Sequence, residues 1–405
     1  MPTRKAAPEG FVTAAPGLPG ARLVSLDIFR GLTIAGMILV NDPGSWSSIY
    51  WPLDHAPWNG WTPTDLIFPF FLFIVGVAMV FSFGMRTERG ASRGMLAWHV
   101  LRRSVIIFAL GLFLNGFPYF HLSRLRISGV LQRISVCYLF AGLIVLLSGL
   151  GREKEAGQVA PAGRPERKAV IAILLVILVL LVGYWALMTF VPVPGYGAGR
   201  LDPDGNLAAY VDRWLMLGHL WKPTWDPEGV LSTLPAIATV LIGVLVGVWL
   251  RTPRTQPTKV VGLLAVGVAG LIQGRLLDPL FPINKNLWTS SYVIFTAGFA
   301  MVLLAVIYWV VDVRGYRRWG APFLVFGMNS ILAFTLSTWL AKCSIVFKVT
   351  RGDGRMVTWH NYVYGRFFEG LASPKNASLL FALAYVLLWL AVMWLFYHRR
   401  IFVRI

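Results

Sequence analysis

The sequence predicts an all-α polytopic membrane protein. Of its 405 residues, 57% are hydrophobic and only 14% are charged, whereas about a quarter of the residues in a soluble domain are charged. Apolar runs of about 18 residues or more recur along the chain, which is the length that an α-helix needs to cross a bilayer. Because these runs do not alternate between apolar and polar residues, they exclude the strands of a transmembrane barrel.

Ten membrane-spanning helices are expected from these runs. Their ranges are 25–41, 64–84, 101–118, 128–150, 169–191, 230–250, 258–276, 291–311, 321–345 and 377–397. Residues 1–21 are rich in Ala, Pro and Gly and lack the apolar centre of a signal peptide, so we expect a flexible cytoplasmic tail there. One membrane domain is then expected over residues 22–405. Cys137 and Cys343 lie inside apolar runs and are expected to pack as small hydrophobic residues.

The distribution of basic residues predicts that both termini are cytoplasmic. With the N-terminus inside, the inner segments carry roughly twice as many Lys and Arg residues as the outer loops, as the positive-inside rule requires. The net charge of +19 is then explained by short basic clusters beside the membrane and not by nucleic-acid binding. In this orientation the loop 42–63 lies on the outer side.

The loop before the second span is the richest in chemically active side chains. It reads WPLDHAPWNGWTPTD from Trp51 to Asp65 and leads directly into an apolar run. His55 is the candidate general base, because imidazole transfers protons near neutral pH. An incidental loop histidine is the alternative that this residue alone leaves open.

Polar residues in the first span share one helix face. Asp27 and Arg30 are three residues apart, and Asn41 stands three helical turns further on, about 16 Å along the axis. Ionisable groups inside a bilayer usually line a cavity or a path. An internal salt bridge with an asparagine that ends the helix would explain the same pattern.

Two later segments place polar residues near the outer ends of spans. Gln132 and Arg133 lie about one turn into the fourth span. The permanent charge of arginine requires an acidic partner, a polar cavity or the headgroup region. Before the eighth span the sequence FPINKNLWTSSY also fits a plain interfacial anchor and holds Asn284, Lys285, Asn286 and Trp288.

Other features of the spans indicate helix packing. Asn329 in the ninth span is expected to bond a neighbouring helix, and Gly243 and Gly247 of the run GVLVG are expected to let two helices approach closely. The sequence contains no GxxxxGK or HExxH motif. The residues alone therefore leave three functions open, namely an enzyme, a carrier or flippase for a sugar or lipid-linked glycan, and a scaffold subunit.

Five blocks of the sequence, in order, resemble the heparan-α-glucosaminide N-acetyltransferase family and its bacterial relatives. They read LVSLDIFRGLTIAGMILVN, DHAPWNGWTPTDLIFPFFLFIVG, LRISGVLQRIS, INKNLWTSSYV and GMNSILAF, between about residues 22 and 345. The resemblance implies a transmembrane acyltransferase bundle of ten or eleven helices without a metal. Such a protein takes acetyl-CoA from the cytosol and acetylates an amino sugar or glycan on the other side. A homodimer in a bacterial plasma membrane is implied as well.

The resemblance also implies roles for individual residues. His55 matches the active histidine of the family, and Asn41 matches its asparagine at the end of the first span. Asp54 or Asp65 could orient the histidine, and Asp65 is favoured because it lies in the matching block. Donor binding is expected of Asp27, Arg30, Gln132 and Arg133 and, from their inner position alone, of Arg102 and Arg103. Acceptor binding is expected of Trp58, Asn59, Asn284, Lys285, Asn286 and Trp288. Direct transfer and an acetyl-histidine intermediate both agree with these residues.

Overall fold

The computed structural model describes residues 23–150, 167–352 and 354–403, so the expected tail 1–21 lies outside the described residues. In this part of the chain, nine helices are long and apolar enough to cross a membrane, and a bent pair supplies a tenth crossing. The all-α polytopic architecture is therefore confirmed. The nine are α1 (Val24–Asn41), α2 (Ile67–Glu88), α3 (Arg93–Gly116), α4 (Val130–Ser148), α5 (Arg167–Phe190), α7 (Thr233–Arg251), α8 (Gln256–Leu277), α9 (Ser290–Tyr308) and α13 (Pro374–His398).

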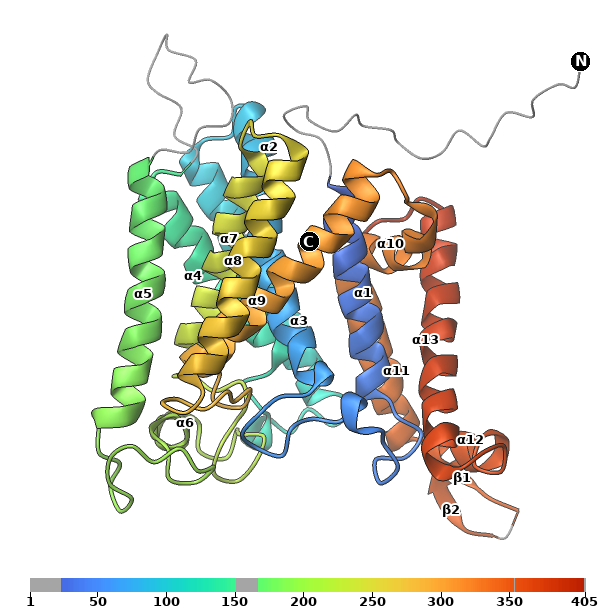
Figure 1. Cartoon of the computed structure of the whole chain (residues 1–405). Helices are drawn as coiled ribbons and strands as arrows, with labels where there is room; N and C mark the ends of the chain where they lie inside the picture. The colour runs from blue at the N-terminus through green and yellow to red at the C-terminus, as the bar shows by residue number, and fades with distance from the viewer. Residues whose placement is uncertain (1–22, 151–166, 353, 404–405) are drawn as a thin grey trace, which may run out of the picture.

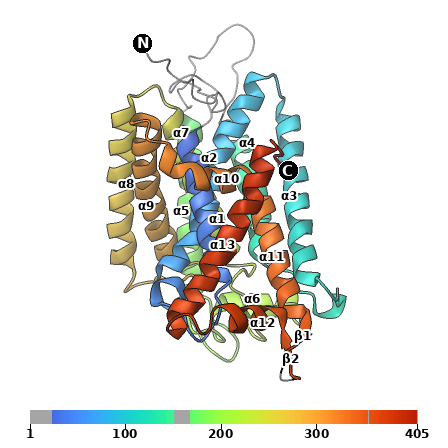
Figure 2. The same ribbon diagram turned by 90° about the vertical axis from the view of Figure 1, so that its right-hand side faces the viewer.

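The remaining elements are short. The bent pair is α10 (Ala321–Met328) and α11 (Ser330–Val346), and α9 continues as a π-helical turn over Trp309–Val313. Two short helices, α6 (Leu207–Met216) and α12 (Trp359–Phe367), lie at one end of the bundle, as does an antiparallel hairpin of β1 (Lys348–Thr350) and β2 (Met356–Thr358) (Figures 1 and 2). Single 3₁₀ turns occupy Trp51–Leu53, Pro63–Leu66, Leu122–Arg124 and Arg318–Gly320.

The helices are arranged around α7 and α2. These two are the most buried of the membrane-spanning helices. In α7, 78% of the apolar 18-residue stretch lies inside the protein, and in α2 72% does, whereas the share in α13 is only 17%. α1 begins and α13 ends at the same end of the bundle (Figures 1 and 2), as ten crossings require. The side of the membrane that this end faces stays a prediction.

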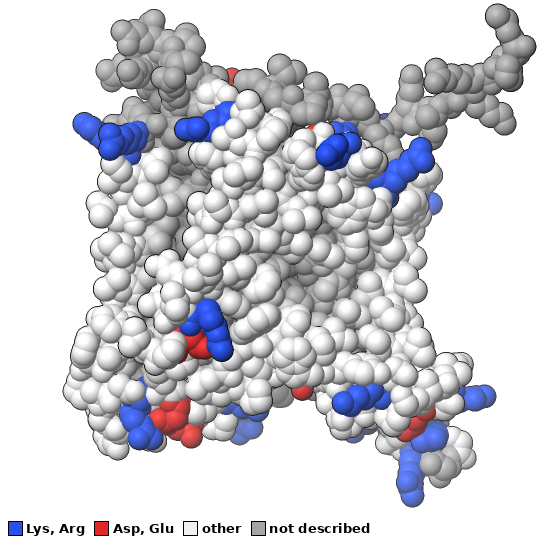
Figure 3. Space-filling view, viewed as in Figure 1, with Lys and Arg blue, Asp and Glu red and all other residues white. Residues whose placement is uncertain are grey.

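The surface has the charge distribution of a membrane protein. On the face shown in Figure 3, charged side chains gather toward the two ends, and the wide belt between them is uncharged apart from one adjacent pair of opposite charges. An uncharged belt of this kind suits the apolar interior of a bilayer. The protein is therefore an integral, multi-pass membrane protein.

Glycines let α2 and α7 cross in backbone contact. A Cβ atom added to Gly76 would lie 1.9 Å from the carbonyl oxygen of Val240, and one added to Gly243 would lie 2.1 Å from that of Phe73. The expectation that the GVLVG run serves packing is confirmed. Small residues at such crossings allow the close approach that stabilises helix pairs in membranes.

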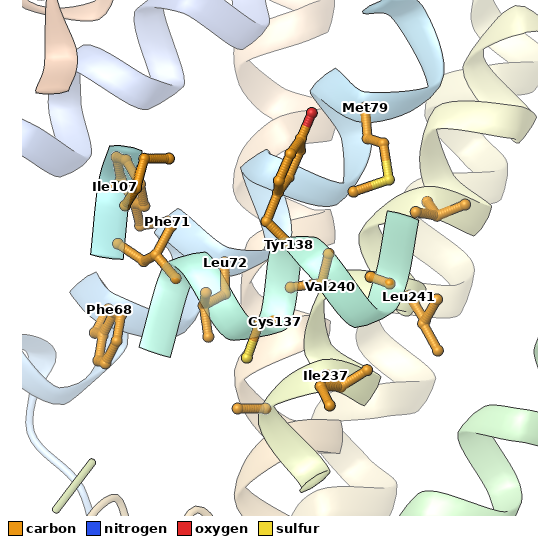
Figure 4. Packing of buried hydrophobic residues seen from close by; sticks show 14 of the residues in the cluster. Phe68, Phe71, Leu72, Met79, Ile107, Cys137, Tyr138, Ile237, Val240 and Leu241 are labelled. Carbon is orange, nitrogen blue, oxygen red and sulfur yellow. The ribbon is translucent and has the colours of Figure 1, made fainter. Parts of the chain in front are cut away.

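Both cysteines lie in the protein interior. Cys137 and Cys343 are free and buried. Figure 4 shows Cys137 of α4 among apolar side chains of other helices, such as Leu72 and Ile237. Their expected role as small hydrophobic residues is confirmed.

The ninth span is broken, which the sequence analysis did not predict. α10 and α11 meet at an angle of 73°, with Asn329 between them. The Asn329 amide does not bond a neighbouring helix. It donates to the carbonyl of Ile401 at 3.0 Å and accepts from the backbone of Val403 at 2.9 Å. Backbone groups that are not in a helix need hydrogen-bond partners at membrane depth. The side chain of Asn329 supplies such partners to the C-terminal segment, and that segment in turn fixes the side chain of the residue at the break.

The third span begins earlier than predicted. α3 starts at Arg93, where the hydroxyl of Ser92 accepts a hydrogen bond from Met95 and caps the helix. A search for apolar runs finds only the part of a helix that lies in lipid. The sequence therefore does not reveal the polar first turns of α3. Arg102 and Arg103 consequently lie almost three turns into the helix and not at its start.

Candidate active site

The loop between α1 and α2 folds around a capping box at residues 62–65. The backbone and hydroxyl of Thr62 donate to the Asp65 carboxylate at 3.0 and 3.2 Å, and the backbone of Asp65 donates back to Thr62 at 3.0 Å. Pro63 opens the 3₁₀ turn, where no backbone donor is needed. The sequence TPTD thus fixes a buried carboxylate just before α2.

His55 and Asp65 form the centre of the site. Oδ1 of Asp65 lies 2.7 Å from Nδ1 of His55, and Oδ2 accepts the backbone N–H of Ala56 at 3.0 Å. The Asp65 side chain is 1% exposed and that of His55 is 45% exposed. Because the carboxylate orients Nδ1 as a donor, Nε2 of the accessible imidazole is left with the lone pair that a general base needs.

Lys285 reaches the same imidazole from a distant loop. Its Nζ lies 3.1 and 3.2 Å from the two ring nitrogens of His55 and 3.7 Å from Oδ1 of Asp65. Burial lowers the pKa of the Lys285 ammonium, although the carboxylates of Asp65 and Glu228 oppose this change. The expected placement of Lys285 at the site is therefore observed, but its contact with His55 was not foreseen.

The two loops that meet at His55 are joined by hydrogen bonds. The Asn284 amide donates to Asn59 at 3.0 Å and accepts from the backbone of Leu287 at 2.9 Å, while the backbone of Gly60 donates to Ile283 at 2.7 Å. Asn284 is fully buried. These contacts fix the position of Lys285, which follows Asn284 directly.

Tyr292 is a site residue that the sequence analysis missed. It lies in the first turn of α9, fully buried, and its hydroxyl donates to the backbone carbonyl of Asp65 at 2.5 Å. Thr62 was missed as well, although its capping box is visible in the sequence. Nothing in the sequence indicates the contact of Tyr292, because it joins segments that are far apart in the chain.

The two tryptophans expected at the site differ in their surroundings. Trp58 is partly exposed, and its indole donates to Leu201 at 2.8 Å and packs on Trp225. Trp288 is 1% exposed, has a φ of 53° and donates to Thr239 at 3.2 Å. Trp288 is therefore enclosed by protein, whereas Trp58 retains surface that a substrate can contact.

Arg133 lies beneath the site. It forms no ion pair with any residue that the structure describes, so the acidic partner that the sequence analysis left open is not observed there. One Nη donates to Gly229 at 3.0 Å and to Ser232, and the guanidinium lies 5.1 Å from the centre of the Trp288 ring. Its Nε and other Nη have no partner among the described residues. The charge is thus stabilised by neutral oxygens and a π face.

Five other predicted site residues lie away from His55. Asp27 and Arg30 pair at 3.0 Å at the opposite end of α1. Gln132 packs on Gly111 of α3. Arg103 lies 5.0 Å from the ring centre of Tyr138, and Arg102 is exposed on α3. The structure therefore does not bring these residues to the histidine.

Asn41 is the last residue of α1, at the same end of the bundle as the His55 loop. It is exposed. Its amide makes no hydrogen bond with any side chain or backbone group in the described ranges. The amide is therefore available to a ligand, as is that of the half-buried Asn286, which is likewise uncommitted among the described residues.

Comparisons with known proteins indicate the family of the chain. A sequence profile described as "Heparan-alpha-glucosaminide N-acetyltransferase, catalytic" matches residues 22–151. The human heparan-alpha-glucosaminide N-acetyltransferase is 33% identical over 354 residues, which cover 77% of this chain and 52% of the relative. The chain belongs to the heparan-α-glucosaminide N-acetyltransferase family.

A second member of the family, from mouse, is 33% identical over 361 residues that cover 77% of this chain and 53% of the relative. The chain thus spans about half the length of the curated relatives it matches. The part matched by the family's catalytic profile contains Asn41, His55, Asp65, Gln132 and Arg133. Lys285 lies outside it.

Proposed function

We propose that the protein transfers the acetyl group of acetyl-CoA, supplied from the cytosolic side, to the amine of an amino sugar or glycan on the opposite side of the membrane. The observation that carries this proposal is the 2.7 Å contact between the buried Asp65 and the accessible His55. This pair is a general base with its orienting carboxylate, which the acetylation of an amine requires. Membership of the family supplies the reaction class.

His55 would act first on the acceptor. Its Nε2 accepts a proton from the amine as the nitrogen attacks the thioester carbonyl, and the imidazolium then returns the proton to the departing thiolate. The ion pair with Asp65 stabilises the imidazolium that forms between these steps. A positioned base of this kind contributes about 10²–10⁴ in rate.

Asn41 is proposed as the donor to the oxyanion that develops on the thioester carbonyl. Its uncommitted amide at the end of α1 supports this role. Removal of one such donor raises the barrier by about 3–4 kcal/mol in well-studied acyl transfer. Arg133 is proposed to hold the thioester end of the donor, because it has buried nitrogens without a partner in the described part of the chain. Gln132, whose buried amide nitrogen also has no partner there, is proposed to contact the donor further from His55.

The remaining predicted residues receive separate roles. Trp58, Asn59 and Asn286 are proposed to contact the acceptor, since they lie in the two loops that meet at His55. Asn284 and Trp288 are buried and are proposed to position those loops. Near the other end of the bundle, ionic contacts to the nucleotide phosphates of the donor are proposed for Arg30, Arg102 and Arg103. Asp27 is proposed to orient Arg30, with which it pairs.

A titration of the purified protein with acetyl-CoA tests the proposal. A ligand that binds only the folded state stabilises it by about 2.7 kcal/mol at one hundred times its Kd. We therefore expect acetyl-CoA to raise the apparent Tm, and N-acetylglucosamine to form when D-glucosamine is added. A protein that neither binds acetyl-CoA nor forms product would contradict the proposal, and movement of sugar into vesicles without any donor would favour a carrier.

A further inference from the structure

Lys285 carries a primary amine at the place where the proposed reaction requires one. Its Nζ lies 3.1 Å from Nδ1 and 3.2 Å from Nε2 of His55, so it contacts the imidazole without lying in line with the Nε2 lone pair. The amine of the sugar acceptor must approach that lone pair for proton transfer to the general base. The protein thus holds one of its own amines within one side-chain rotation of the place where its substrate amine would react.

The surroundings of Lys285 favour an uncharged amine. The side chain is 18% exposed, and burial lowers the pKa of the ammonium. Arg133 also disfavours the positive charge, whereas Asp65 and Glu228 favour it. An amine must be deprotonated to act as a nucleophile, so burial increases the reactive fraction.

We propose that Lys285 is a self-acetylation site, modified with the help of His55 when acetyl-CoA is bound and no sugar occupies the site. This inference rests on the proposed function. Nζ attacks the thioester carbonyl, a C–N bond forms and the C–S bond breaks. His55 takes one proton from the amine and passes it to the leaving thiolate. The products are Nζ-acetyl-lysine and CoA–SH, so no further reactant is needed.

Acetylation would limit the activity of the protein. The product is an amide, which His55 cannot transfer onward as it would an activated acyl group, and its bulk stays beside the imidazole. The basic amine near Asp65 is lost as well. A protein exposed to donor without acceptor would therefore become progressively inactive.

The wild-type protein provides the first test. Full-length protein is incubated with acetyl-CoA alone and digested, and acetylation is measured at Lys285 and at Lys222, an exposed lysine in an outer loop. Non-enzymatic acetylation favours the exposed lysine. We expect Lys285 to be modified faster by about 10²-fold, the lower range for a positioned base. Equal or slower modification of Lys285 would overturn the inference.

Two variants complete the test. His55→Asn removes the base with little change in shape, and we expect it to reduce acetylation of Lys285 to the rate of Lys222; an unchanged rate would also overturn the inference. When labelled acetyl-CoA is used, the rapidly formed, amide-linked acetyl label should disappear in Lys285→Arg. The same label should persist in Lys222→Arg. Label that remains in Lys285→Arg but is released by hydroxylamine would identify acetyl-histidine, since amides resist that reagent.

The outcomes separate this inference from the proposed function. A protein that acetylates D-glucosamine but leaves Lys285 unmodified retains the function and refutes self-acetylation. A protein that acetylates neither amine refutes both.

Discussion

Oδ1 of the buried Asp65 lies 2.7 Å from Nδ1 of the accessible His55. The same oxygen lies 3.7 Å from Nζ of Lys285. One carboxylate therefore contacts both a candidate base and a candidate nucleophile. The capping box with Thr62 holds this carboxylate in place, and the hydroxyl of Tyr292 bonds the backbone carbonyl of Asp65. The geometry of the site therefore depends on the local fold of the loop and on its contact with α9.

Asp65→Asn should abolish most of the activity without unfolding the protein. An amide can still accept the hydrogen bonds from Thr62 but cannot stabilise an imidazolium, so we expect kcat to fall by about 10²–10⁴ with little change in KM. Asp54→Asn is the matched control, because the Asp54 carboxylate bonds the backbone of His55 and not its ring. Steady-state kinetics of both variants check this prediction, and similar losses in the two would speak against it.

Asn284→Ala should loosen the loop that carries Lys285. The substitution removes the bonds to Asn59 and Leu287 and leaves buried groups unpaired, which costs about 1–3 kcal/mol for each group. Asn59→Ala removes only one partner at an exposed position and should destabilise the protein less. Thermal unfolding and acetylation of Lys285 are the measurements. If Asn59→Ala is the more harmful change, the loop is held by other contacts.

Gly243→Ala should destabilise the bundle. The added methyl group would clash with the carbonyl oxygen of Phe73, and overpacking of this kind costs about 1–3 kcal/mol. Gly183→Ala in α5 is the control, since a Cβ there meets no atom within 4 Å; it should stabilise the helix by up to about 1 kcal/mol. A decrease in apparent Tm for the control but not for Gly243→Ala would refute the crossing of α2 and α7 described above.

Asp212 predicts a pH dependence of stability. Burial raises its pKa from 3.8 to about 7, although the backbone N–H of Val230 lowers it. Between these values the folded protein keeps a proton that the unfolded chain releases. The free energy of unfolding should therefore fall as pH rises, by at most about 1.4 kcal/mol per unit. Asp212→Asn lacks this dependence. The apparent Tm of the variant minus that of the wild type should therefore increase as the pH rises from 4 to 7. A constant difference over that range would contradict the burial of the carboxyl.

The sequence predicts the spans well, because length and apolarity alone determine whether a helix can cross a bilayer. It does not predict the break at Asn329. The polar side chain was visible, but its partners are backbone groups of residues 401 and 403, which no window of neighbouring residues contains. The short helices α6 and α12 were missed because they depend on capping residues such as Asn206 and Thr358, not on long apolar runs.

The site was predictable to a similar extent. His55 and Asp65 are ten residues apart in one loop, and their pairing follows from local turn chemistry. The contact of His55 with Lys285 joins residues that are 230 positions apart, so only the packing of α2 and α9 reveals it. Of the three environments left open for Arg133, an acidic partner, a polar cavity or the headgroup region, the acidic partner is not observed in the described part of the chain, because neutral oxygens and an aromatic ring contact the guanidinium instead.

The most direct test of the central claim uses proteoliposomes with radiolabelled acetyl-CoA outside and D-glucosamine enclosed. Wild-type protein should form labelled N-acetylglucosamine inside the vesicles, and His55→Asn should form at least about 10²-fold less while still being stabilised by acetyl-CoA. Equal turnover by His55→Asn, or product only when donor and acceptor share one side, would contradict a His55-dependent transfer across the membrane.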